Sequence, residues 1–149
     1  MLNVAVIGMG WWGKTLVTAI GKSSKLRVVK GVKRNPATEA EFAREHKFEI
    51  ISDYSGVLKD PTIQGVVLCT PHTLHCQHIV SSLEAGAHVY CEKPMASDLE
   101  SADRICATSE RTGRKVAIAH QAVYLPQVQR IKEMIEEGRI GDVISIYSA

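Results

Sequence analysis

A glycine-rich loop directly after a short apolar run is the feature that most constrains how this chain folds. Residues Asn3–Ile7 are mostly apolar and β-branched, which is typical of a strand buried in a parallel sheet. The loop Gly8-Met9-Gly10-Trp11-Trp12-Gly13 follows at once, and from Trp11 to Lys22 the apolar residues recur at helical spacing. The start of the chain therefore predicts a strand, a tight turn and a helix in direct succession.

Each glycine of the loop has a separate role in such a unit. Gly8 allows the tight turn, Gly10 lets a ligand approach the backbone, and Gly13 permits close contact between helix and strand. The helix N-terminus then offers free N–H groups and the positive end of its dipole. An ordinary glycine-rich turn is the alternative. The position between a predicted strand and a predicted helix favours a site for the pyrophosphate of a dinucleotide.

The same alternation of strand and helix continues to about residue 120. Helices of roughly 10–15 residues between short apolar strands are typical of βαβ units and a parallel sheet. The fold class predicted is therefore α/β, a Rossmann-type doubly wound sheet. Further strands are expected at Leu26–Val32, Gly65–Cys69, His88–Cys91 and Val116–Ala119, and helices at Ala37–His46, from Asp53, at His72–Ala85, and from Ser97 or Asp98 to Thr112.

After residue 120 the pattern changes. Tyr124–Glu137 has the apolar spacing of one amphipathic helix, and Val143–Tyr147 has the pattern of a new strand. A strand so close to the end of the sequence has little to pair with. We therefore expect a dinucleotide-binding domain at residues 1–121, followed at 122–149 by a connecting helix and the first strand of a truncated second α/β domain, as in a fragment of a longer protein.

The composition argues against several functional classes. Hydrophobic residues make up 45% and charged residues 23%, near the globular average, and the net charge is only +2. This balance favours neither nucleic acid nor a membrane surface as a partner. The sequence lacks a signal-peptide pattern and an apolar stretch of the roughly 20 residues that a membrane helix needs. The four cysteines are isolated, which predicts free thiols and a cytoplasmic location.

The residues after the second strand indicate which dinucleotide binds. A carboxylate about 20 residues beyond the last glycine usually contacts the ribose of NAD. Lys33 stands at that distance from Gly13 (33 − 13 = 20), and Arg34 follows it. A cation attracts the 2′-phosphate of NADP, whereas a carboxylate repels it. We therefore predict a preference for NADP(H), with NAD(H) as the second candidate; the alternative is that both cations are ordinary surface charges.

Two further loops follow predicted strands at the carboxyl edge of the sheet, where ligands of open parallel sheets bind. The first is Thr70-Pro71-His72-Thr73-Leu74-His75. Zinc could be suggested by His72, His75, Cys76 and His78, but these groups share one short segment and no second ligand pair follows, so no metal is predicted. The second is Glu92-Lys93-Pro94, whose lysine could exchange a proton; by itself, however, this tripeptide favours an ordinary exposed lysine at a strand end.

Four segments in this order resemble the glucose–fructose oxidoreductase / inositol dehydrogenase / rhizopine catabolism family (Gfo/Idh/MocA). They are VAVIGMGWWG, TPHTLH, AGAHVYCEKPMA and IKEMIEEGRIGDV, which together span nearly the whole chain. The third is the most specific, and it makes Lys93 the best catalytic candidate. The resemblance implies a two-domain, homo-oligomeric NAD(P)-dependent oxidoreductase that moves a hydride between a nicotinamide and a carbinol carbon of a sugar, cyclitol or related polyol.

The resemblance also implies roles for single residues. Lys93 would lie beside the nicotinamide and the substrate hydroxyl, and a cis Lys93–Pro94 bond would shape its loop. An Asp and a His that complete the site would lie beyond residue 149. Cofactor-binding residues would be Gly8, Met9, Gly10, Trp11, Trp12, Gly13, Lys33, Arg34, Cys69, Thr70, Pro71, His72, His75, Glu92, Lys93, Pro94 and Gln121, with His120 beside Gln121 at the nicotinamide end.

The chain also departs from the family pattern. Lys33 replaces the common acidic contact, and Val123-Tyr124-Leu125-Pro126 lacks the Arg that many members carry before an aromatic residue. The sequence leaves open whether Trp11 and Trp12 cover the pyrophosphate or Trp12 packs on the sheet. A non-catalytic dinucleotide sensor is the alternative function, although a sensor has no need for Lys93.

Overall fold

Six parallel strands form one sheet in the order β3-β2-β1-β4-β5-β6. The structure is a computed structural model, and it describes residues 1–147. Because the strand order reverses beside β1, the doubly wound Rossmann-type prediction is confirmed. The strands are β1 (Leu2–Ile7), β2 (Leu26–Val32), β3 (Glu49–Ile51), β4 (Gly65–Leu68), β5 (His88–Cys91) and β6 (Val116–Ile118).

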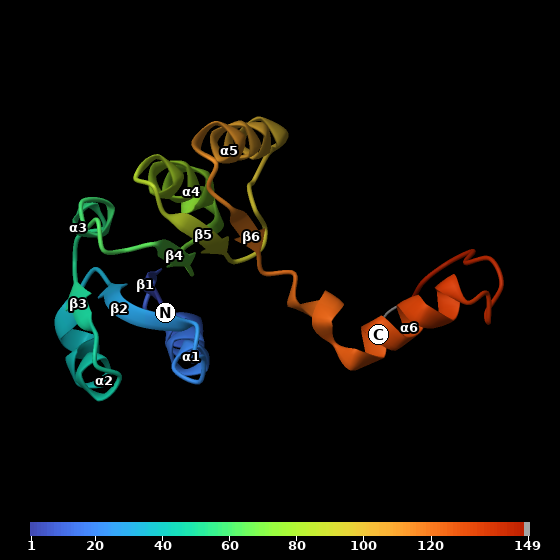
Figure 1. Cartoon of the computed structure of the whole chain (residues 1–149), viewed down its shortest axis with the longest axis horizontal. Helices are drawn as coiled ribbons and strands as arrows, with labels where there is room; N and C mark the ends of the chain where they lie inside the picture. Colours follow the sequence, from blue (N-terminus) through green and yellow to red (C-terminus); the bar gives the residue numbers. More distant parts are fainter. Residues whose placement is uncertain (148–149) are drawn as a thin grey trace. The chain divides into compact units, whose positions relative to one another are not determined.

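Helices cover both faces of this sheet. Figure 1 shows α3, α4 and α5 on one face and α1 and α2 on the other. The α-helices are α1 (Trp11–Ile20), α2 (Ala40–Glu45), α3 (Ser55–Leu58), α4 (His75–Glu84), α5 (Leu99–Thr112) and α6 (Pro126–Glu136); the short 3-10 helices are η1 (Pro36–Glu39), η2 (His72–Leu74) and η3 (Gln121–Tyr124).

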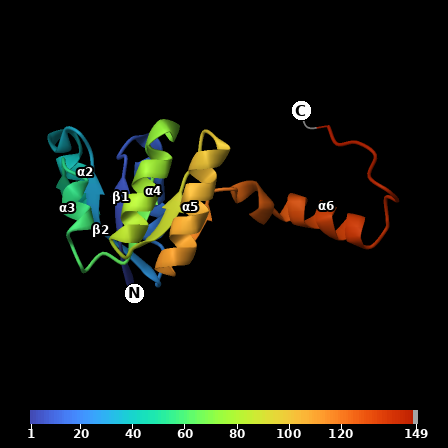
Figure 2. The same cartoon turned by 90° about the horizontal axis from the view of Figure 1, so that it is seen from above.

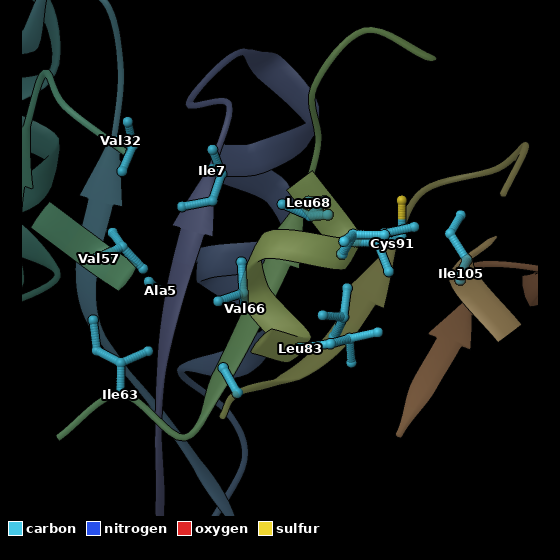
Figure 3. Close-up of a cluster of buried hydrophobic side chains, with 14 residues drawn as sticks. Ala5, Ile7, Val32, Val57, Ile63, Val66, Leu68, Leu83, Cys91 and Ile105 are labelled. Carbon is cyan, nitrogen blue, oxygen red and sulfur yellow. The ribbon is translucent and has the colours of Figure 1, made fainter. Parts of the chain in front are cut away.

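Alternate residues of β1 supply the cores on its two sides. Ala5 and Ile7 belong to the cluster beneath α3, α4 and α5, part of which is drawn in Figure 3. Val4 and Val6 belong to a second cluster that includes Val17 of α1. All four β1 side chains are at most 5% exposed. Burial on both faces explains why this strand reads as a continuous apolar run.

Helices α4 and α5 lie side by side (Figure 2), and α4 packs against β4 and β5. The Asp98 carboxylate accepts a hydrogen bond from the Ser101 backbone N–H at 2.7 Å, so Asp98, one of the two expected caps, begins α5. Gly113 ends it with φ +66°, a left-handed conformation that glycine adopts readily.

Strand β3 is an element that the sequence reasoning missed. It has only three residues and pairs at the sheet edge with Lys30–Val32 of β2. Such a short strand, with Glu49 exposed and its two isoleucines only partly buried, leaves little periodicity to recognise. Its place matters because the residue after it, Ser52, reaches the carboxyl edge of the sheet.

The chain divides into two compact units, Met1–Ala119 and the residues from His120 onward. In the second unit α6 begins at Pro126 rather than at the expected Tyr124, because proline suits the first position of a helix. The expected strand at Val143–Tyr147 is wrong: these residues are irregular and pair with no strand in the described chain. An apolar alternation alone does not make a strand without a neighbour to bond.

No helix within residues 1–147 combines the length and the apolar character needed to cross a membrane.

An ion pair joins β2 to the loop before β4, and it makes stability depend on pH. Lys30 Nζ lies 2.7 Å from Asp60 Oδ2, and Thr62 donates two further hydrogen bonds to Asp60 Oδ1. The Lys30 hydrogen bond, with those from Thr62, lowers the pKa of Asp60 from 3.8 to about 2. The carboxylate's contribution is therefore complete above pH 3.8 and is lost as the pH falls towards about 2.

We expect Asp60→Asn to lower the thermal midpoint at neutral pH and to lose less stability than wild type between about pH 4 and pH 2. The two curves should approach each other at the acidic end. Thermal unfolding followed by circular dichroism measures this. Parallel curves for the two proteins would show that the Asp60 carboxylate does not carry the effect.

Candidate functional site

The glycine loop leaves no room for side chains at two of its positions. Gly8 has φ +94°, and a Cβ on it would lie 2.5 Å from the carbonyl oxygen of Cys69. A Cβ on Gly13 would lie 2.2 Å from the carbonyl oxygen of Gly8. A Cβ on Gly10 would meet no described atom within 4 Å. Gly8 and Gly13 therefore let the β4 loop and α1 close on β1, while Gly10 leaves open space beside the backbone.

The N-terminus of α1 faces this open space uncapped. Gly10 is the N-cap residue, so it supplies no side-chain acceptor, and the first turn of the helix contains no acidic residue. The first N–H groups of the helix thus keep their positive partial charge available for an anion.

A cleft of about 450 Å³ lies at the carboxyl ends of β1 to β4. It occupies the place where the strand order reverses, which is where ligands bind in open α/β sheets. Its walls bring together Gly8, Met9, Gly10, Lys33, Arg34, Cys69, Thr70 and Pro71 from the predicted set, and they add Ile7, Val32, Ser52, Leu74 and His78.

The added residues had weak signals in the sequence. Ser52 follows β3, so missing that strand also hid this position. His78 was considered only as a metal ligand, yet its Nδ1 lies 3.4 Å from Thr70 Oγ1, in the wall of the cleft. Burial, together with the nearby His75, lowers the pKa of His78. The residue is therefore neutral near pH 7.

Met9 and Cys69 contribute apolar surface to the site. The Met9 side chain is 1% exposed and packs in the core beside Phe48, so it supports the loop from beneath. Cys69 is half-buried, and burial, with a smaller effect of the Glu92 carboxylate, raises the pKa of its thiol to about 12. It is therefore an uncharged thiol at neutral pH.

The two cations predicted to select the cofactor differ in their surroundings. Lys33 Nζ forms an ion pair with Glu39, whose side chain is only 9% exposed, and Lys14 lies 3.2 Å from the other carboxylate oxygen. Arg34 is exposed, lines the cleft, and has no ion-pair or hydrogen-bond partner within residues 1–147. Sequence spacing alone did not reveal that Glu39 holds Lys33.

His75 lies outside the cleft. It is fully buried, with Nε2 2.9 Å from the Thr70 carbonyl oxygen and Nδ1 2.7 Å from that of Pro94. The imidazole thus joins the loop after β4 to the loop after β5. His72 is exposed on η2. In the described part of the chain, no three His, Cys, Asp or Glu side chains gather closely enough to hold a metal ion.

The loop after β5 is also tied to the glycine loop. Trp12 Nε1 donates a hydrogen bond of 2.5 Å to Glu92 Oε1, across 80 positions of sequence. Trp12 is therefore held in place by Glu92, whereas Trp11 is 76% exposed. The Lys93–Pro94 peptide bond is cis, as the resemblance implied, and Lys93 is exposed.

Gln121 and His120 belong to the second unit, where Gln121 begins η3 and both side chains are exposed.

Residues 2–120 match the model of an oxidoreductase family with an NAD-binding Rossmann fold, Gfo/Idh/MocA. The chain belongs to this family. The match covers the cleft, the loop with the Trp12–Glu92 bond, and the whole sheet. The family resemblance predicted from the four sequence segments is thus confirmed.

Three Gfo/Idh/MocA-like proteins illustrate the similarity. Levoglucosan dehydrogenase of Pseudarthrobacter phenanthrenivorans is 33% identical over 153 aligned residues, which cover 97% of this chain and 39% of that protein. A putative NADPH-dependent oxidoreductase from Desulfitobacterium hafniense has a TM-score of 0.87 at 29% identity, and the match covers 95% of this chain and 41% of that one. A 3-ketoreductase from Actinomadura kijaniata, in complex with NADP and TDP-benzene, has a TM-score of 0.88 at 25% identity. This match covers 95% of this chain and 44% of that one. The chain spans about two fifths of the length of these proteins.

The glycine geometry predicts that two similar substitutions lower stability to very different extents. We expect Gly13→Ala to destabilise the fold by about 3 kcal/mol, because the new methyl group overlaps the Gly8 carbonyl. Gly10→Ala should change stability by less than about 1 kcal/mol, since its methyl group enters open space. Urea denaturation of both variants measures the difference, and equal losses would contradict the close approach of α1 to β1.

Proposed function

We propose that the Met1–Ala119 unit binds a nicotinamide dinucleotide in the cleft and prefers NADP(H), with NAD(H) as the weaker ligand. The observation that carries this proposal is the cleft itself. At the reversal point of the sheet, it combines the open backbone of Gly10 with Lys33 and Arg34 on one wall. Such a site offers N–H groups to a pyrophosphate and cations to a 2′-phosphate.

The residues present fit this cofactor. The uncapped N-terminus of α1 and the backbone at Gly10 would hold the pyrophosphate, and Arg34 would hold the 2′-phosphate. Leu74 and Pro71 give the cleft an apolar wall. NADP is the ligand of the Actinomadura relative, while the family description names NAD, so both dinucleotides are chemically reasonable.

We further propose that the whole protein is an oxidoreductase acting on a sugar, cyclitol or related polyol. The name of the levoglucosan relative supports this substrate class. When bound, the nicotinamide supplies the hydride acceptor or donor. Lys93, exposed at the end of β5 and without a partner among residues 1–147, would then hold or accept the proton of the substrate hydroxyl.

The fixed position of this lysine depends on its neighbours. Glu92 donates its backbone N–H to the Leu68 carbonyl at 3.0 Å and accepts the Trp12 hydrogen bond, while the Pro94 carbonyl faces His75. The residues on both sides of Lys93 are thus anchored, while its side-chain amino group has no partner among residues 1–147. A proton-transfer group needs this combination of fixed backbone and accessible head.

The cofactor proposal predicts a difference between two dinucleotides that titration can measure. Trp11 and Trp12, the only two tryptophans of the chain, both stand in the glycine loop, so their fluorescence should fall on binding. We expect NADPH to bind at least about fivefold more tightly than NADH. Arg34→Gln should lower the affinity for NADPH about tenfold and change the affinity for NADH by less than about twofold. Arg44→Gln, which removes an exposed cation of α2, is the matched control. Tighter binding of NADH would overturn the preference.

The same titration tests the pyrophosphate site. We expect Gly10→Ala to lower the affinity for NADPH and NADH alike, by about tenfold or more, because the new methyl group enters the space beside the backbone. Unchanged affinity in a folded variant would place the pyrophosphate elsewhere.

The catalytic proposal is tested in the full-length gene product with a panel of sugars and polyols. We expect Lys93→Ala to lower kcat by about 100-fold or more with little change in dinucleotide affinity. Lys115 directly precedes β6, so it lies at the amino ends of the strands, whereas Lys93 lies at their carboxyl ends. Lys115→Ala should therefore leave kcat unchanged. Equal turnover in wild type and Lys93→Ala would remove Lys93 from the mechanism. Tight dinucleotide binding without turnover of any substrate would favour a sensor.

A further inference from the structure

A buried carboxylate beneath the cleft has no part in the function proposed above. Glu39 ends η1, is 8% exposed, and receives Lys33 on one carboxylate oxygen and Lys14 on the other. The three groups come from three separate elements: the end of β2, the first turns of α1, and η1. Lys14 also lies over the ring of Phe42, 5.8 Å from its centroid.

The charges of this cluster decide what its lysines offer to a ligand. The hydrogen bond from Lys33, and a weaker one from Lys14, lower the pKa of Glu39, so the carboxylate is charged at neutral pH. One negative charge among two lysines leaves a net charge of +1. Lys33, the lysine of this pair that lines the cleft, is therefore largely neutralised by a carboxylate whose side chain is only 9% exposed.

We propose that Glu39 is a specificity-determining residue, which sets how strongly the cleft favours a dinucleotide with a 2′-phosphate over one without it. A phosphate that recruits Lys33 must compete with the Glu39 carboxylate for the same ammonium group. Arg34 has no such competitor in the described chain and binds the phosphate directly. Glu39 thus restrains the discrimination that the pair Lys33-Arg34 would otherwise give. This inference rests on dinucleotide binding in the cleft, but not on which dinucleotide wild type prefers.

Neutralising Glu39 should release the restraint. We expect Glu39→Gln to tighten NADPH binding by about threefold to tenfold while changing NADH by less than about twofold, since only NADPH carries the phosphate. Glu41→Gln is the matched control: it removes an exposed carboxylate two positions away, gives the chain the same net charge, and should leave both affinities unchanged. If Glu39 acts through Lys33, the gain should disappear when Glu39→Gln is combined with Lys33→Gln.

The experiment is the tryptophan titration of the 149-residue chain with NADPH and with NADH, for wild type and each variant. Circular dichroism checks the fold, because breaking a buried ion pair can destabilise a protein. Glu39→Met is the second variant if Glu39→Gln unfolds, since methionine fills a similar volume without needing a polar partner, and the same gain is expected from it.

The outcomes separate the two proposals. The role of Glu39 would be overturned if the Glu39 variants bound NADPH within about twofold of wild type, or if Glu41→Gln showed the same gain in NADPH affinity. Either result would leave the proposal of dinucleotide binding intact. A wild type that prefers NADH, with a Glu39 variant that gains NADPH affinity, would overturn the proposed preference and support the role of Glu39. A wild type that binds neither dinucleotide would overturn both.

Discussion

The contact between the end of β1 and the first turn of α1 admits no side chain, and the arrangement of the cleft follows from it. With a Cβ at Gly13 only 2.2 Å from the Gly8 carbonyl, any larger residue would push the helix away from the strand. The helix N-terminus would then no longer face the space beside Gly10. Because Gly8 closes in the same way on Cys69, the β4 loop is placed by the same constraint. Two missing methyl groups thus position the uncapped N-terminus of α1 and one wall of the cleft.

The site consists of two parts that the fold joins by long-range hydrogen bonds. One part is the cleft with its cations, and the other is the loop of Glu92-Lys93-Pro94. Trp12 connects the second part to the glycine loop, and His75 connects it to Thr70 in the cleft wall. Since each of these side chains is at least partly buried, the bonds are poorly exposed to competing water. The lysine proposed to move a proton is therefore on a loop held by the same elements that form the cleft.

The sequence was sufficient for features that depend on neighbours along the chain. The glycine loop, the apolar strands beside it and the Asp98 cap are local patterns, and all three are present in the structure. Features that depend on a distant partner were missed. Nothing near Trp12 indicates that its indole reaches a carboxylate 80 positions away. Glu39 is close to Lys33 in sequence, yet only the turn of η1 shows that the two side chains meet. The apolar pattern at Val143–Tyr147 predicted a strand where no partner strand is present among the described residues.

The bridge formed by His75 has a consequence for protein engineering. Its ring lies between the Thr70 and Pro94 carbonyls, so the conformation of the loop that carries Lys93 is partly encoded in α4, a helix that precedes β5. A designer who transplants Glu92-Lys93-Pro94 onto another Rossmann sheet would move Lys93 without the contacts that hold its loop. The smallest transferable module runs from Thr70 to Pro94, with a tryptophan supplied at the host's own glycine loop.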